Sequence, residues 1–205
     1  LYGRNSTGGL INIYTYSPLD YQNTMAKISY GSRNDLRLGV NHYQKISSRV
    51  GINVVANYHH NDGFFRNLYT GEKADNLQSA NTKVGLAWQA TPLWTMRLSA
   101  LFDHSTQGGY PYGHYHAVDN TADAVNYNRP GYYRRNLFTA GMNWLYKGNA
   151  VHFNSQTSVQ LSKDKQQIDQ DFTPRDLFFT ITGLKQTLVS QEFTLRSAKD
   201  NSRYH

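Results

Sequence analysis

Apolar and polar residues alternate at every second position through most of this chain. In the segment ANTKVGLAWQA, Val84, Leu86 and Trp88 fall on one side of an extended chain, and polar or small residues fall on the other. A helix would scatter charged residues through the apolar stripe, so this period indicates β-strands. Eight segments with this pattern predict eight strands, at residues 24–30, 36–45, 50–60, 80–90, 95–104, 135–146, 151–168 and 185–196.

The connections between these predicted strands alternate in length. Short connections lie at residues 45–49, 91–94 and 147–150, and long, polar, aromatic-rich ones at 64–79, 107–135 and 171–183. Only the hairpin near residues 31–34 is short where a long loop is expected. Tight turns on one rim and large loops on the other predict an all-β fold, an up-and-down antiparallel sheet of the kind that forms transmembrane β-barrels.

Aromatic residues are abundant in a chain that is polar on average. The 205 residues include 16 Tyr, 9 Phe and 3 Trp, against a mean hydropathy of −0.67. No apolar run approaches the roughly 20 residues of a membrane-spanning helix. Trp88, Trp94, Trp144 and Tyr146 lie beside short turns, where an interfacial girdle of a barrel would lie. Core aromatics at the end of a soluble β-sandwich remain the alternative, because alternation alone fits both folds.

Charge and residue types narrow the range of functions. Lys and Arg (21) outnumber Asp and Glu (14), which gives a net charge of +7, but no nucleic-acid-binding module accompanies this charge. The absence of Cys excludes disulfides and thiolate metal sites. No nucleophile–base or paired-carboxylate constellation has the spacing that catalysis requires. The sequence therefore predicts neither an enzyme nor a nucleic-acid partner.

Three groups of residues raise the question of metal or haem binding. The adjacent His59 and His60 would point to opposite faces of a strand and could not chelate one ion. His114 and His116 would share a face, but no carboxylate or Cys lies near them in the pattern, so we expect no metal site and no cofactor. Ligation of haem iron by one of these two histidines stays open. Asp169 and Asp171 in QIDQDF fit either Ca²⁺ binding or a solvated acidic turn.

The opening stretch LYGRNSTGGLINIYTYSP carries a specific motif. It lacks the Gly-Lys-Ser/Thr of a phosphate loop and the G-x-G-x-x-G of a dinucleotide site. It resembles the end of the plug domain of TonB-dependent outer-membrane receptors, where Tyr-Gly-Arg-x-x-x-Gly-Gly-x-Ile-Asn-Ile leads into the barrel. GFFRNLYTGEKADNLQSANTKVGLAWQATPLWTMRLSALFDH and DQDFTPRDLFFT…VSQEFTLRS resemble siderophore-type members, and QGGYPYGHYH resembles members of the Bacteroidetes branch.

This resemblance covers essentially the whole chain and implies its organisation and role. Residues 1–17 would be the end of a plug domain, and residues 18–205 the N-terminal part of a barrel that has about 22 strands in the family. The implied function is import of a ferric siderophore across the outer membrane of a Gram-negative cell, energised by TonB through an upstream segment. Haem, cobalamin or an oligosaccharide are alternative ligands, and a passive porin is disfavoured by the plug motif. The other implied partners are outer-membrane lipid and lipopolysaccharide.

The resemblance also implies a contact between plug and barrel. In the family, an arginine of the plug turn is held by glutamates of the barrel wall, and Arg4 matches that arginine. Glu192 is a candidate partner, since the apolar residues beside it alternate so as to turn it inward. The alternative is that Arg4 stabilises its own turn and that Glu192 pairs with Arg196 or a neighbouring strand.

The segment 107–135 contains the candidate ligand-binding residues. Aromatic faces stack on planar ligand groups, and Arg or protonated His attracts anionic complexes such as ferric siderophores. The candidates, expected on one extracellular loop, are Tyr110, Tyr112, His114, Tyr115, His116, Tyr132, Tyr133, Arg134 and Arg135. Packing of the loop on itself, with contact between its basic residues and lipopolysaccharide phosphates, is the alternative.

Overall fold

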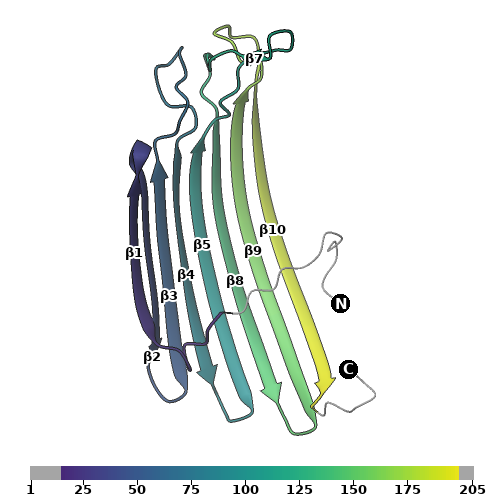
Figure 1. Ribbon diagram of the computed structural model, residues 1–205. Coiled ribbons are helices and arrows are strands. Elements are labelled where there is room, and N and C mark those ends of the chain that lie inside the picture. The colour runs from purple at the N-terminus through teal and green to yellow at the C-terminus, as the bar shows by residue number, and fades with distance from the viewer. Residues whose placement is uncertain (1–14, 199–205) are drawn as a thin grey trace.

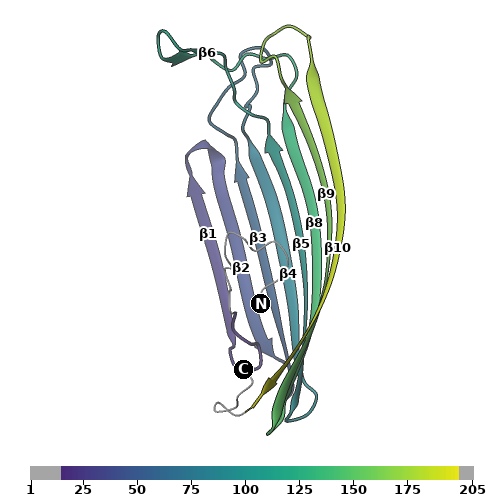
Figure 2. The same cartoon turned by 90° about the vertical axis from the view of Figure 1, so that its right-hand side faces the viewer.

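A computed structural model of the chain, described here for residues 15–198, contains one large curved sheet (Figures 1 and 2). Its eight strands are antiparallel, and each pairs with its neighbours in chain order. They are β1 (Asn23–Gly31), β2 (Asp35–Lys45), β3 (Val50–Asn61), β4 (Leu77–Gln89), β5 (Trp94–Gly108), β8 (Tyr132–Lys147), β9 (Val151–Asp169) and β10 (Phe179–Ser197). Within these residues, β6 (Tyr115–His116) and β7 (Thr121–Ala122) form a separate small hairpin.

The eight predicted strands are confirmed in number and order, but several are longer than predicted. β4 begins three residues early, at Leu77, and β5 continues to Gly108. β8 begins at Tyr132, and β10 begins at Phe179, before the predicted position 185. All of these extensions lie at the rim that carries the long loops. Backbone hydrogen bonds between strands continue there through polar residues, which the hydrophobic pattern does not reveal.

The register places apolar and polar residues on opposite faces of the sheet. Leu86 lies opposite Leu98, and Leu98 lies opposite Met142, so one face is apolar across three strands. The other face carries the polar row Arg97, Asn143, Gln156 and Glu192, which are partners in successive strand pairs. Because side chains alternate along every strand, this register extends the two faces over the whole sheet.

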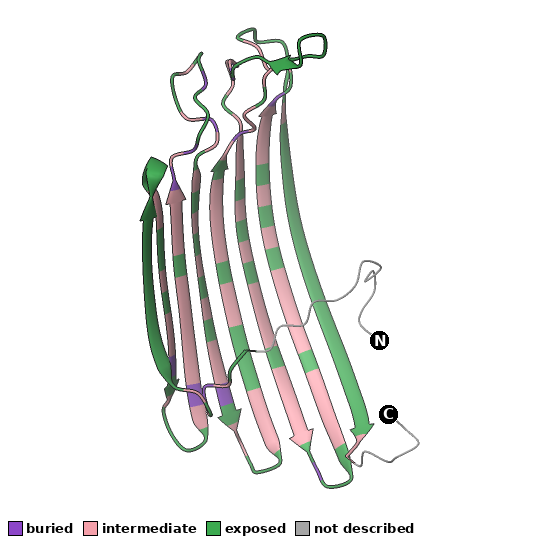
Figure 3. Cartoon of the chain, in the orientation of Figure 1, coloured by how far each residue is buried: buried purple, intermediate pink, exposed green. Residues whose placement is uncertain are grey.

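The apolar face is uncovered in the described part of the chain. Phe102, Phe193 and Leu195 are 50%, 68% and 70% exposed, and no second sheet packs on them among residues 15–198. Figure 3 shows the inner strands banded in exposed and intermediate residues and the edge strands β1 and β10 exposed almost throughout, with buried positions confined to strand ends and loops. A soluble β-sandwich buries its apolar face against a second sheet, so this arrangement contradicts the sandwich alternative.

The aromatic residues beside the short turns form one patch on the apolar face. Trp94 contacts Tyr146 with ring centroids 4.9 Å apart and lies 6.1 Å from Trp144. Trp88 meets the same Trp144 ring at 6.4 Å in an edge-on arrangement. The predicted grouping of these four aromatics is therefore confirmed, and it lies at the rim opposite the long loops.

Residues 15–22 pack on the polar face before the chain enters β1. The Tyr16 and Tyr21 rings stack at 4.4 Å, and Tyr21 meets the buried Tyr43 edge-on at 5.4 Å. A Cβ at Gly51 would lie 2.5 Å from the carbonyl oxygen of Pro18, so glycine is needed for this close approach. No helix among the described residues is long and apolar enough to cross a bilayer.

Candidate ligand-binding loops

Three long connections gather at one rim of the sheet (Figure 1). We call them the first loop (residues 62–76, between β3 and β4), the second loop (109–131, between β5 and β8) and the third loop (170–178, between β9 and β10). The opposite rim carries short turns, as predicted. In Figure 2 the small hairpin of the second loop, marked by the β6 label, projects away from the sheet.

Asn67 fastens the first loop to the second. It is 2% exposed, and its Nδ2 donates to the carbonyl oxygen of Tyr127 at 2.8 Å. Its Oδ1 accepts from the backbone N–H of Tyr127 at 3.2 Å and of Tyr69 at 3.0 Å. The side chain therefore pairs with Tyr127 as a strand backbone would. A backbone bond from Leu68 N–H to the Val125 carbonyl, 2.8 Å, adds to this junction.

The two loops also share a small apolar core. Ala74 of the first loop packs with Val125 and Tyr127 of the second, and all three are at most 6% exposed. Burial raises the pKa of the Tyr127 hydroxyl, and the nearby Asp169 and Asp75 carboxylates add to the effect. The loops thus have a packed interior of their own, which the uncovered sheet lacks.

The third loop is joined to the second by charged groups. Arg129 donates to both carboxylate oxygens of Asp176, from Nε at 2.9 Å and from an Nη at 2.7 Å, and its guanidinium lies over the Phe179 ring. The hydrogen bond from Arg129 holds the pKa of Asp176 below its usual value. The buried Asp169 accepts the backbone N–H of Arg129 at 3.2 Å. All three loops are therefore connected.

The aspartates considered for Ca²⁺ have a different role. Asp169 accepts the backbone N–H groups of Asp171 and Phe172, at 3.2 and 3.0 Å. Asp171 accepts the Thr173 hydroxyl at 2.6 Å and the backbone N–H groups of Leu177 and Phe178, and these bonds lower its pKa, with the Thr173 bond the main cause. The carboxylates shape the turn, and Asp169 is buried rather than solvated.

Two predicted ligand residues form an aromatic surface on the second loop. The Tyr110 and Tyr112 rings are stacked at 5.7 Å and nearly parallel. Phe172 of the third loop meets Tyr112 edge-on at 5.3 Å, and Gln166 of β9 donates to the Tyr110 hydroxyl. Phe172 was not among the predicted residues, because only the folded loops bring it to Tyr112. Tyr115 lies apart from this surface, on the small hairpin, where its hydroxyl donates to Asn120 at 2.8 Å.

The expectation that residues 132–135 lie on the loop is wrong, because they are the first residues of β8. Because successive side chains of a strand point to opposite faces, these four residues are divided between the two faces of the sheet. Tyr133 and Arg135 lie on the polar face, where the Tyr133 hydroxyl donates to Asp164. Tyr132 and Arg134 lie on the other face, where the Arg134 guanidinium lies 4.6 Å from the Tyr132 ring centroid. The predicted ligand residues therefore do not form one surface.

Arg134 belongs to a basic patch above the apolar face. It lies opposite Lys165, and the next row on the same face places Lys163 directly opposite Lys185. All four side chains are exposed. Like charges that face one another across strands repel, so binding of an anion would stabilise this patch.

The histidine pairs behave differently from one another. His59 and His60 point to opposite sides, as predicted, toward Asp35 at 3.2 Å and Asp62 at 3.0 Å respectively. His114 and His116 share one side, also as predicted, with ring centroids 4.9 Å apart.

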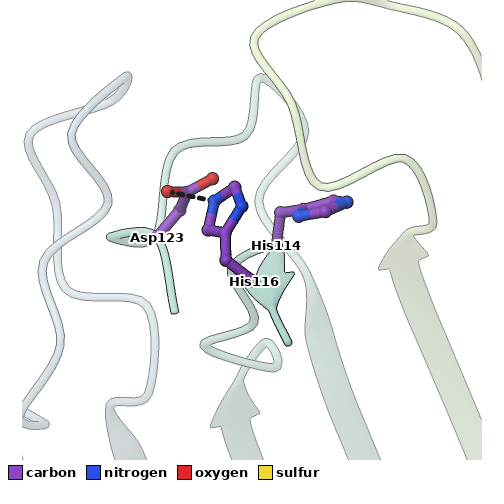
Figure 4. A group of neighbouring side chains, drawn as sticks. All are labelled: His114, His116 and Asp123. Carbon is purple, nitrogen blue, oxygen red and sulfur yellow. Dashed lines mark hydrogen bonds and ion pairs between the residues drawn. The ribbon is translucent and has the colours of Figure 1, made fainter. Parts of the chain in front are cut away.

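The expectation that these two histidines lack a nearby carboxylate is wrong. Asp123 contacts His116, with its Oδ1 3.0 Å from the His116 Nε2 (Figure 4). The sequence concealed Asp123 because the hairpin that returns it to His116 has strands of only two residues, too short to show a period.

Of the predicted plug–barrel pair, only Glu192 can be placed. It lies on the polar face opposite Gln156, as its predicted inward direction requires, and accepts a hydrogen bond from Thr194 at 3.3 Å. Gln156 and Arg97 also line a hollow of about 340 Å³ with residues 15–18. Arg4 lies outside the described residues.

A larger hollow lies away from the loops. It measures about 540 Å³ and follows the middle of the apolar face, over the small side chains of Ala100 and Ala140. Its lining is almost wholly apolar, with few polar groups to orient a ligand. The loop surface, with its aromatic and charged side chains, is the better candidate for ligand recognition.

Comparison with known proteins supports the fold. No family model matches the sequence. Among solved structures, the chain is similar to the ferric-catecholate import receptor Fiu from E. coli K12 in its closed form, with a TM-score of 0.63 and 12% sequence identity. The match covers 86% of this chain but 29% of that receptor, so this chain spans less than a third of its length. At this identity the likeness shows the fold, and the predicted partial, up-and-down antiparallel barrel is confirmed.

Proposed function

We propose that this chain is part of a TonB-dependent receptor that imports a ferric siderophore across the outer membrane of a Gram-negative cell. The observation that carries the proposal is the two-faced sheet. One face exposes large apolar side chains such as Phe102 and Phe193, and the other carries polar groups such as Arg97. A barrel wall between hydrocarbon and a hydrated lumen requires this division. The shared fold with an import receptor supports the same interpretation.

The loops supply the ligand surface in this proposal. A ferric siderophore already fills the coordination sphere of iron, so the receptor needs planar apolar contacts and positive charge rather than iron ligands. The stacked Tyr110 and Tyr112 with Phe172 provide the aromatic contacts. The basic patch of Arg134, Lys163, Lys165 and Lys185 faces outward, and we assign it to lipopolysaccharide phosphates rather than to the siderophore.

The proposal includes a plug and its contact with the wall. Residues 1–17 would be the end of the plug domain, and residues 18–205 would begin the barrel. The packing of Tyr16 and Pro18 on the polar face supports a chain that enters the wall from the lumen. Arg4 of the plug would pair with Glu192 until force from TonB displaces the plug.

Uptake by intact cells tests the proposal. We expect a strain that lacks the gene to lose growth under iron limitation on one defined ferric siderophore, and expect the full-length gene to restore it only when TonB is present. If the mutant takes up every ferric siderophore normally and loses uptake of cobalamin instead, the iron assignment is wrong.

A variant pair locates the ligand surface. Tyr112→Ala removes the ring between Tyr110 and Phe172, and we expect it to weaken ferric siderophore binding to the purified full-length receptor. Stacking on one aromatic ring contributes about 1–3 kcal/mol for nucleobases, and a planar catecholate should lose a similar amount. The control is Tyr69→Ala, because Tyr69 is 57% exposed on the first loop. Equal binding by the two variants would contradict the assignment.

A further inference from the structure

His114, His116 and Asp123 present their side chains on one side of the small hairpin in the second loop (Figure 4). The hairpin pairs Tyr115 with Ala122 and His116 with Thr121. The next position along the ladder brings the backbone N–H of Asp123 to the carbonyl oxygen of His114 at 2.8 Å. His114 and Asp123 are therefore cross-strand neighbours, and His116, two residues on, shares their side.

The donor atoms of the three side chains lie within 4.8 Å of one another, and all three residues are exposed. Tetrahedral zinc, with bonds of about 2.0–2.2 Å to nitrogen and oxygen, holds its ligand atoms about 3.3–3.6 Å apart. Side-chain rotation would have to close the remaining gap, and the hairpin backbone already places the three residues on one side. Water completes the coordination, because the group is open to solvent.

The local backbone holds this arrangement in place. A Cβ at Gly113 would overlap the carbonyl oxygen of Asp123, so only glycine allows the strands to approach at this point. The contact between Asp123 and His116 also holds this imidazole beside the carboxylate before any ion arrives. Because these side chains are already held close together, metal binding loses less side-chain entropy.

We propose that His114, His116 and Asp123 form a binding site for a divalent first-row transition metal, with Zn²⁺ as its reference ion. Two imidazoles and one carboxylate suit zinc and its neighbours better than Ca²⁺ or Mg²⁺, which prefer oxygen ligands alone. On binding, His116 would be the neutral tautomer with its proton on Nδ1, which leaves Nε2 and the Asp123 carboxylate to coordinate the ion. The site does not depend on the proposed siderophore function.

Calorimetry on the full-length protein in detergent, purified without a histidine tag, tests the site with ZnCl₂. We expect one strong zinc site per chain. His116→Ala and Asp123→Asn should each weaken zinc binding at least about tenfold, since loss of even an outer-shell partner typically costs about 10–100-fold. Asp119→Asn, which removes a carboxylate from the same exposed turn, is the matched control and should bind zinc as the unaltered protein does.

A chemical readout on the unaltered protein avoids any folding defect of the variants. Zinc should protect His114 and His116, but not His59, from acylation by diethylpyrocarbonate, as measured by mass spectrometry of the peptides. Absence of zinc binding, equal affinity in the Asp123→Asn variant, or acylation of both histidines at an unchanged rate would each overturn the proposal.

Discussion

The substitution Asn67→Ala tests most directly how the first and second loops are joined. The side chain of Asn67 is the buried group that pairs with both backbone groups of Tyr127, sixty residues away. Alanine is small enough to fit and keeps the backbone path of the first loop. The substitution therefore removes the two hydrogen bonds that the Asn67 side chain makes to the second loop, and it leaves the strands unaltered.

The magnitude follows from the groups left without partners. The N–H and carbonyl of Tyr127 are buried, since that residue is 2% exposed, and each unsatisfied group costs about 1–3 kcal/mol. Tyr69 N–H is nearer to solvent, and water replaces its partner at little cost. Water also reaches Tyr127 as the loops separate, so we take the low end, about 2 kcal/mol for the pair. That is roughly a thirtyfold shift toward separated loops.

Hydrogen exchange of the full-length protein in detergent measures this shift. The reporter is the Leu68 amide, which donates to the Val125 carbonyl across the junction and is not altered by the substitution. We expect its protection to fall about thirtyfold, while amides in the middle of β5 and β8 keep their rates. Asn120→Gly is the control, because Asn120 lies on the second loop away from the junction and has a φ of 52°, which glycine adopts readily.

Unchanged protection at Leu68 in the Asn67→Ala variant would refute the reasoning, because it would mean that the apolar contacts alone hold the loops together. A loss of protection throughout β5 and β8 would also refute it, since the loops would then not be a separate unit. Asn67→Asp provides a finer test. Asp keeps the acceptor atoms but loses the donor to the Tyr127 carbonyl and places a carboxylate against that oxygen. We therefore expect the Leu68 amide to lose more protection in this variant than in Asn67→Ala.

Three further predictions concern the sheet, the third loop and the hairpin. Leu98→Arg, on the apolar face, should lower the free energy of unfolding in lipid by about 2–4 kcal/mol, whereas Ser99→Arg, on the polar face, should change it little; urea titration in vesicles measures both. The bond from Arg129 holds the pKa of Asp176 below its usual value, so the junction of the second and third loops should persist as pH falls from 8 to 5. It should open only as pH falls through that lowered pKa, as spin labels on the two loops would report. Gly113→Ala should open the hairpin and raise amide exchange there, because a methyl group would overlap the facing carbonyl oxygen.

The sheet was predictable because its strands repeat one simple rule of alternation. Along β4, for example, Val84, Leu86 and Trp88 alternate with Lys83 and smaller residues, and the rule holds from strand to strand. The ends of the strands were less predictable. Phe179 begins β10 six residues before the predicted position 185, because the backbone ladder continues where the apolar alternation has ended.

The candidate site was only partly predictable, because loops bring together residues that no period connects. Tyr110 and Tyr112 were found from their aromatic spacing, but Phe172 reaches them from a different loop. Asn67 has no local signature, since its partner is sixty residues away. Asp123 was missed because the two-residue strands of the hairpin show no alternation. Each of these contacts is a property of the folded loops alone.

The distribution of burial explains why the loops carry the specific contacts. In the described part of the chain, the cluster of buried apolar residues (Ala74, Val125 and Tyr127) is in the loops. The sheet buries Tyr43 and Ala87 near strand ends, but β4 and β5 leave large apolar side chains such as Val84 and Phe102 uncovered. A sheet that meets hydrocarbon does not need a protein core, since the bilayer takes the place of one. Loops in water have no such substitute and must bury their own apolar and polar groups against one another. In the proposed receptor, residues in the loops can therefore change to fit a new ligand without disturbing the sheet, provided that junctions such as the one at Asn67 are kept.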